Sequence, residues 1–124
     1  MPLLALVIDD SMLIRHTVCR FLETRGFKVE TAANGIAALE VLQLVRPDLI
    51  VTDLQMPKLS GYELIDTLKA DEKTANIPIL VLAAKPSADL HLDKRIHTLI
   101  HKDLNVEEQM EQALESLFPR PATS

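Results

Sequence analysis

Acidic side chains follow two apolar runs of this 124-residue chain. Asp9 and Asp10 come directly after residues 3–8, and Asp53 comes directly after residues 49–52. Carboxylates that share one pocket repel each other unless a cation neutralises them. An all-oxygen site with few protein ligands and several waters suits Mg²⁺ better than zinc. If the three side chains meet, they therefore form a candidate magnesium site.

A lysine adds a second kind of positive charge to this group. Lys102 follows the apolar and polar alternation of residues 96–100. Mg²⁺ and an ammonium group together neutralise the oxygens of a phosphoryl group during its transfer. One acidic loop alone is more often a helix cap, but the Asp9–Asp10 pair, Asp53 and Lys102 together favour a carboxylate that accepts a phosphoryl group.

The elements that must position these residues alternate along the chain. Apolar or alternating runs at residues 3–8, 27–31, 49–52, 77–83 and 96–100 predict five strands. Helical periodicity follows Ser11, which can cap a helix, and covers residues 36–45 up to Pro47. It recurs at Leu64, Ile65 and Leu68, and returns after the Asn105 cap. Residues 85–95 predict only a short or irregular helix.

This order indicates an α/β fold, a doubly wound five-stranded parallel sheet with about five helices on its two faces. Such a sheet binds ligands at the carboxyl ends of its strands, where the charged residues fall. We expect one domain over residues 1–118, with residues 119–124 as a tail or a truncated linker.

Composition excludes several other classes. A net charge of -5 with interspersed acids and bases argues against direct nucleic-acid binding. The single cysteine, Cys19, excludes an internal disulfide and a cysteine-rich metal site. No apolar run has the length of a membrane span or a signal peptide. We therefore expect a cytoplasmic protein without a membrane partner.

The stretch D-L-Q-M-P-K-L-S-G from Asp53 to Gly61, with Asp9–Asp10 before it and Lys102 after it, resembles the receiver domain of two-component response regulators. The resemblance covers nearly the whole chain. It implies a flavodoxin-like strand order of 2-1-3-4-5. It also implies a single-domain signalling protein, similar to chemotaxis regulators, whose site works in phosphorelay rather than as an enzyme with an external substrate.

The resemblance also assigns roles within the site. It implies that Asp53 is the phosphoacceptor and that Asp10 binds Mg²⁺ directly. Asp9 would act on the ion through water, and the backbone carbonyl of Gln55 would complete the protein ligands together with Asp53. Lys102 would hold the phosphoryl group or the Asp53 carboxylate.

Three positions depart from the family pattern. The fourth strand of receivers ends in Thr or Ser, whose hydroxyl contacts the phosphoryl group, but Ala83 stands there in this chain. The aromatic residue three places before the lysine is Leu99, and the family's usual proline after the lysine is Asp103. We therefore expect the phosphoryl chemistry to be retained and the conformational switch to respond weakly.

The expected partners are a sensor histidine kinase or a histidine phosphotransfer protein as donor, and another protein as the target of the output. An alternative is a pseudo-receiver, an interaction module that does not depend on phosphorylation, favoured by Ala83 and Leu99. A hydrolase of the haloacid dehalogenase type is disfavoured because Gln55 stands where its general acid would be.

Overall fold

The computed structural model describes residues 3–54, 61–84, 96–103 and 105–118. Strands and helices alternate over residues 4–83, as the sequence predicts, and a further strand and helix lie within residues 96–118. The strands are β1 (Leu4–Ile8), β2 (Lys28–Ala32), β3 (Leu49–Asp53), β4 (Ile79–Ala83) and β5 (Thr98–His101). The helices are α1 (Met12–Thr24), α2 (Gly35–Leu42), α3 (Gly61–Ala70) and α5 (Val106–Leu117).

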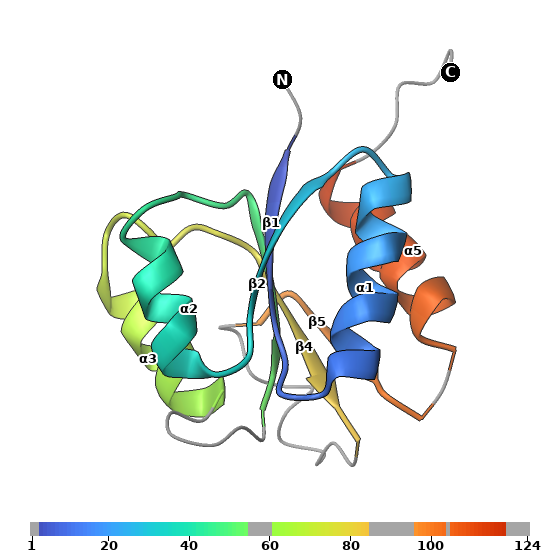
Figure 1. The fold of residues 1–124 in the computed structure, drawn as a ribbon. Coiled ribbons are helices and arrows are strands. Elements are labelled where there is room, and N and C mark those ends of the chain that lie inside the picture. The colour runs from blue at the N-terminus through green and yellow to red at the C-terminus, as the bar shows by residue number, and fades with distance from the viewer. Residues whose placement is uncertain (1–2, 55–60, 85–95, 104, 119–124) are drawn as a thin grey trace.

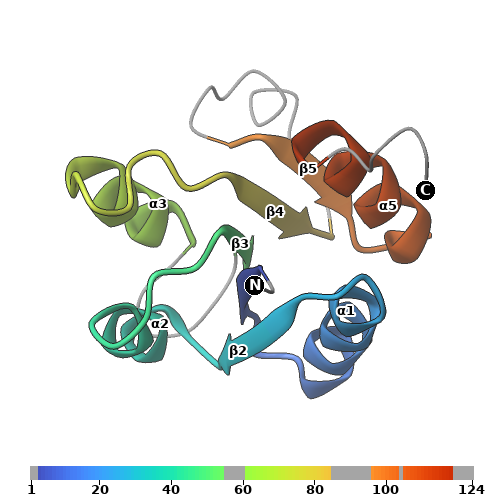
Figure 2. The ribbon, with the colours of Figure 1, turned by 90° about the horizontal axis from the view of Figure 1, so that it is seen from above.

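The strands form one parallel sheet in the order β2-β1-β3-β4-β5. This order confirms the predicted doubly wound fold. Figures 1 and 2 show α2 and α3 on one face of the sheet, and α1 and α5 on the other. The carboxyl ends of β1 and β3 are neighbours, since the two strands pair directly. The fold therefore brings the residues that follow these strands to one place.

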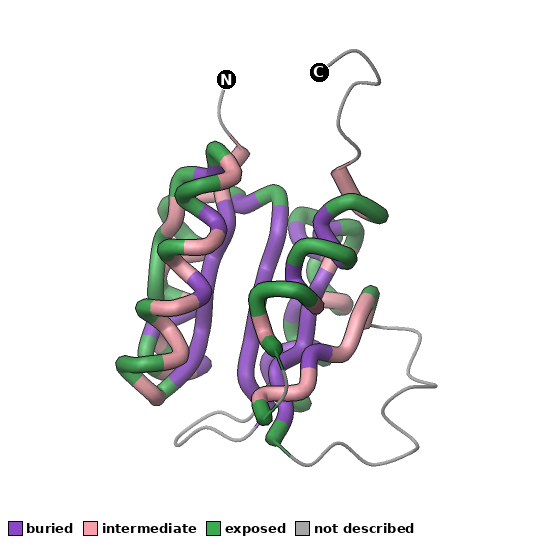
Figure 3. Tube along the Cα trace, turned by 90° about the vertical axis from the view of Figure 1, so that its right-hand side faces the viewer, coloured by how far each residue is buried: buried purple, intermediate pink, exposed green. Residues whose placement is uncertain are grey.

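Side chains alternate between two cores along each strand. In β1, Leu6 and Ile8 pack in the core cluster that includes Leu64 of α3, whereas Ala5 and Val7 pack in the other cluster. The second cluster includes residues of α1 and α5 such as Val18, Leu22, Met110 and Leu114. Figure 3 shows the buried strands between helices whose outer faces are exposed. A sheet covered on both faces gives a rigid base for the loops at its edge.

Polar caps fix the starts of three helices. Ser11 Oγ accepts a hydrogen bond from the Ile14 N–H, Asn34 Oδ1 accepts from the Ala37 N–H, and Asn105 Oδ1 accepts from the Glu108 N–H. Each cap satisfies a backbone donor that has no partner within its helix. Ser11 and Asn105 were predicted as caps from the sequence.

Several predicted element ends shift by a few residues. The helix predicted to run to Val45 ends at Leu42, because the Gln43 and Leu44 N–H groups bond three residues back, to Glu40 and Val41, and tighten the last turn. In β4 the strand begins at Ile79, directly after Pro78, which has no N–H to donate. The helix predicted over residues 85–95 lies outside the described residues.

Among the helices that the structure describes, none combines the length and the apolar character needed to cross a bilayer.

Candidate functional site

Three carboxylates converge at the carboxyl edge of the sheet. Asp53 is the last residue of β3, and Asp9 and Asp10 follow the neighbouring strand β1. One ligand oxygen from each residue lies within 4.8 Å of the others. Asp9 is fully buried, Asp53 is 5% exposed, and Asp10 is exposed to solvent. The structure thus places the sequence-predicted carboxylates in one cluster that is open to solvent on the Asp10 side.

Backbone and side-chain contacts hold Asp9 from three directions. Its N–H donates to the Ala32 carbonyl of β2 at 3.2 Å, and its Oδ1 accepts from the Ser11 N–H at 2.8 Å. Its carbonyl accepts from Nη1 of Arg15 in α1 at 2.7 Å. Asp9 therefore has a fixed position relative to both β2 and α1.

Lys102 connects two of the carboxylates. Its Nζ lies 3.0 Å from Asp9 Oδ2 and 3.0 Å from Asp53 Oδ2. The lysine side chain is 15% exposed, so these charges interact in a partly desolvated environment. The Lys102 N–H donates to the Ala83 carbonyl at 2.9 Å, which fixes the lysine backbone beside the end of β4.

The charges in the cluster shift two pKa values. Burial raises the pKa of Asp9 above its usual value, and the Asp53 charge adds to this, although the Ser11 N–H and Lys102 oppose it. Burial alone would lower the pKa of Lys102, but its close contacts with the Asp53 and Asp9 carboxylates raise it overall. Lys102 therefore holds its proton more tightly than an ordinary lysine does, whereas the surroundings of Asp9 destabilise its ionised form.

The atoms of the cluster fit a hard divalent cation. Asp9 Oδ2 is buried, and among the described residues it accepts no hydrogen bond of good geometry and forms an ion pair with the Lys102 ammonium. The possible ligands found here are carboxylate oxygens from three aspartates, with no thiolate or imidazole among them. Oxygen ligands with a side open to water suit Mg²⁺. The carboxylate oxygens of the cluster are therefore suitable ligands for the expected Mg²⁺ ion.

The remaining predicted positions are placed only in part. Gln55 lies outside the described residues. Ala83 ends β4 and is 6% exposed, and its β4 neighbour Leu82 pairs in register with Asp53. Leu99 is half-buried in β5 and packs against the core cluster on the α2 and α3 face. Ala83 thus lies one residue beyond the strand partner of Asp53, at the same edge of the sheet.

Sequence reasoning missed Arg15, which anchors the Asp9 carbonyl. The sequence did contain one signal of this contact. A basic side chain near the start of a helix is unfavourable to the helix dipole, so Arg15 at that place indicates another partner. The first turn of α1 contains no acidic residue that would pair with Arg15 locally. The contact itself depends on how the loop between β1 and α1 folds back.

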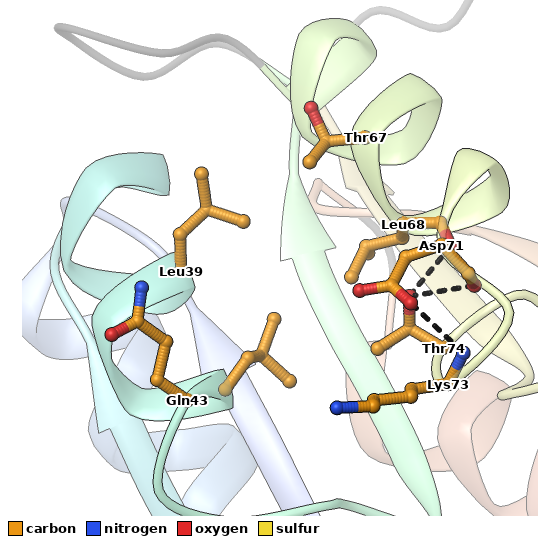
Figure 4. Close-up of a pocket in the computed structure, with 8 residues that line it drawn as sticks. Leu39, Gln43, Thr67, Leu68, Asp71, Lys73 and Thr74 are labelled. Carbon is orange, nitrogen blue, oxygen red and sulfur yellow. Dashed lines mark hydrogen bonds between the residues drawn. The ribbon is translucent and has the colours of Figure 1, made fainter.

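A separate hollow of about 250 Å³ lies between α2 and α3. Figure 4 shows Leu39 of α2 and the adjoining Gln43 on one side and Thr67, Leu68 and Asp71 on the other. These residues belong to the C-terminal halves of the two helices and to the turn after α3, which lead back to the starts of β3 and β4. The hollow contains none of the clustered carboxylates, so the acidic edge stays the candidate site.

Comparisons with known proteins agree on one family. Residues 5–115 match the family described as "Response regulator receiver domain". The chain is 35% identical over 108 residues to "Hybrid signal transduction histidine kinase D" of Dictyostelium discoideum, which covers 85% of this chain and 7% of that protein. It is 39% identical over 87 residues to "Response regulator MprA" of a Mycobacterium species, covering 70% of this chain and 37% of that protein.

A solved structure extends the agreement to the fold. The chemotaxis protein CheY4 of Vibrio cholerae superimposes with a TM-score of 0.86 at 29% identity, covering 95% of this chain and all of that one. The chain thus spans only a minor part of the two curated relatives named above, 7% and 37%, and nearly the whole of this solved structure.

Proposed function

Because this chain belongs to the response regulator receiver family, we propose that it accepts a phosphoryl group on the Asp53 carboxylate in the presence of Mg²⁺. Receiver domains are phosphorelay signalling modules that interact with histidine kinases and output domains. The observation that carries the proposal is the Lys102 ammonium 3.0 Å from both Asp53 and Asp9, beside a third carboxylate.

The geometry supports an in-line transfer. A carboxylate oxygen of Asp53 attacks the phosphorus atom of a phosphohistidine, the P–O bond forms as the P–N bond breaks, and the departing imidazole keeps the electron pair and takes up a proton. Lys102 stabilises the negative charge on the phosphoryl oxygens. Mg²⁺, when bound, supplies further charge neutralisation on the same oxygens.

Four residues are proposed as protein ligands of the ion: Asp9, Asp10, Asp53 and the Gln55 backbone carbonyl. The buried Asp9 Oδ2, which lacks a hydrogen bond, supports this assignment for the described carboxylates. Asp10 would bind the ion directly, and Asp9 would act on it through water. The aspartyl phosphate is then hydrolysed by water, so the protein limits its own signal and turns over no external substrate.

Exposed apolar side chains near the starts of three helices support a protein phosphodonor. Met12 and Leu13 in α1 are 75% and 73% exposed, and Ile36 of α2 and Tyr62 of α3 are also exposed. Each of these helices begins after the carboxyl end of a strand, so the side chains surround the edge that holds Asp53. A sensor histidine kinase or a histidine phosphotransfer protein can bury them while it presents its histidine.

The test is phosphorylation by acetyl phosphate with Mg²⁺, followed by mass spectrometry or Phos-tag electrophoresis. We expect label on the wild-type protein and none on Asp53→Asn. Asp66→Asn, a change at an exposed aspartate of α3, is the matched control and should behave as the wild type. Labelling of Asp53→Asn equal to that of the wild type would exclude Asp53 as the acceptor.

The second candidate is a pseudo-receiver that binds partners independently of phosphorylation. The buried Ala83 at the end of β4 favours it, because this position offers no hydroxyl to a phosphoryl group. Absence of phosphate transfer from both acetyl phosphate and a kinase, together with unchanged partner binding by Asp53→Asn, would favour this candidate.

A further inference from the structure

The side-chain amide of Gln109 pairs with the backbone of His101 as a neighbouring strand would. Gln109 Oε1 accepts from the His101 N–H at 2.9 Å, and Gln109 Nε2 donates to the His101 carbonyl at 3.0 Å. Nε2 also donates to the Asn105 carbonyl at 3.2 Å, which ties the amide to the first turn of α5. One side chain thus joins α5 to the last residue of β5.

This contact falls on the open edge of the sheet. Among the described strands β5 is the last in the sheet order, so its outer side has no strand partner. The Lys102 N–H points inward to the Ala83 carbonyl, and backbone groups of successive strand residues point to opposite sides. The polar groups of His101 therefore face outward, where the Gln109 amide satisfies both of them.

The same contact holds the peptide group that carries Lys102. This peptide consists of the His101 carbonyl and the Lys102 N–H. Gln109 bonds the first and the Ala83 carbonyl bonds the second, from opposite sides. The Lys102 ammonium lies 3.0 Å from Asp53 at the end of a long, flexible side chain, so its reach depends on where this peptide is held.

We propose that Gln109 is a positioning residue that holds the backbone of Lys102 in place for its contact with Asp53 and, after phosphorylation, with the phosphoryl group. The contact with a phosphoryl group rests on the proposed function. The contact with the Asp53 carboxylate exists without any phosphoryl group, so the two parts can be tested separately.

The first experiment compares Gln109→Met with Gln112→Met. Methionine keeps the length of the side chain and removes all three hydrogen bonds of the amide, two to His101 and one to Asn105. Gln112 is an exposed residue of the same helix. With Mg²⁺ in excess, we expect Gln109→Met to weaken the binding of beryllofluoride, a phosphoryl mimic, roughly threefold to tenfold, the effect of losing ordinary hydrogen bonds. Gln112→Met should bind as the wild type.

The second experiment is a double-mutant cycle between Gln109→Met and Lys102→Met, measured by urea unfolding without Mg²⁺. If Gln109 acts through Lys102, its effect on the unfolding constant should be at least about threefold smaller once the lysine is gone. A purely structural role in closing the sheet edge predicts the same loss in both backgrounds. Gln109→Glu, which keeps the acceptor for the His101 N–H, replaces Gln109→Met if that variant does not fold.

The outcomes separate the two claims. Equal losses in both backgrounds would overturn the positioning role, whatever the mimic does. If the wild-type protein fails to bind beryllofluoride, the proposed phosphoryl function fails and the cycle alone decides the positioning of Lys102. If Gln109→Met binds beryllofluoride as tightly as the wild type while the double-mutant cycle is non-additive, Gln109 positions Lys102 for Asp53 but not for the phosphoryl group.

Discussion

Adding Mg²⁺ to the metal-free protein should raise its melting temperature through the cluster of Asp9, Asp10 and Asp53. Oxygens of Asp9 and Asp53 lie within 4.8 Å, where two unit charges repel by roughly 3 kcal/mol at an effective dielectric constant of about 20. The Lys102 ammonium, 3.0 Å from each, offsets part of this repulsion. In the part of the chain that the structure describes, one ammonium lies in a cluster of three carboxylates, so the negative charge of the cluster favours the binding of a divalent cation.

The size of the effect follows from linkage. An ion that binds only the folded state stabilises it by roughly 1.4 kcal/mol at a concentration about tenfold above its dissociation constant. For a chain of 124 residues, 1 kcal/mol corresponds to roughly 3 to 5 °C in melting temperature. We therefore expect a rise of about 4 to 7 °C at that concentration, and a further rise with the logarithm of the Mg²⁺ concentration.

Circular dichroism melts over a Mg²⁺ titration measure this rise. NaCl at matched ionic strength controls for general screening of the negative chain. Asp10→Asn should lose most of the Mg²⁺ response, because it removes a proposed direct ligand, whereas Glu40→Gln, at an exposed residue of α2, should keep it. An equal rise in NaCl, or an unchanged Mg²⁺ response in Asp10→Asn, would refute a metal site at this cluster.

Three further predictions concern the same edge. Lys102→Gln should weaken beryllofluoride binding roughly tenfold or more, because it removes a charge-assisted hydrogen bond, and should strengthen Mg²⁺ binding by removing a competing cation; calorimetric titration measures both. The raised pKa of Asp9 means that the folded metal-free protein binds this proton more readily than the unfolded chain does. Acidification through that pKa should therefore stabilise the metal-free form and reduce the Mg²⁺-induced rise in melting temperature. If the Mg²⁺-induced rise stays constant down to about pH 3.8, where an ordinary aspartate titrates, this prediction is wrong. Beryllofluoride should shift the amide resonances of residues 96–103 only slightly in the wild type and more in Ala83→Thr, and large shifts in the wild type would count against a weakened switch.

The sequence predicted the parts of the site that depend on strand ends. Asp9, Asp10 and Asp53 follow apolar runs, and parallel strands gather their carboxyl ends at one edge whatever the details of packing. Strand positions and helix faces followed from hydrophobic periodicity, whereas the strand order followed from the resemblance to receiver domains. The end of α2 was harder to predict, because extending a helix by one turn changes the free energy of folding by little when its residues lie outside the core.

Contacts between a side chain and a distant backbone group were not predictable in this way. Arg15 bonds the Asp9 carbonyl, and Gln109 bonds both backbone groups of His101. In the sequence, both residues look like ordinary polar positions of amphipathic helices. Periodicity indicates which face of a helix is buried, but it does not indicate which backbone groups that helix will contact. Only the packing of α1 and α5 on the sheet decides which polar groups come within reach.

The contacts that hold the cluster in place would allow the proposed phosphoryl transfer to proceed without a hydroxyl at Ala83. Asp9 is held by β2 and α1, Asp53 ends a central strand, and the Lys102 peptide is held by the Ala83 carbonyl and Gln109. Position 83 contributes to this arrangement through its backbone, which any residue other than proline there would supply equally well. A threonine hydroxyl would add a contact only after a phosphoryl group is bound. An alanine in place of that threonine should therefore leave the acceptance of phosphate largely intact and weaken only the conformational response that follows.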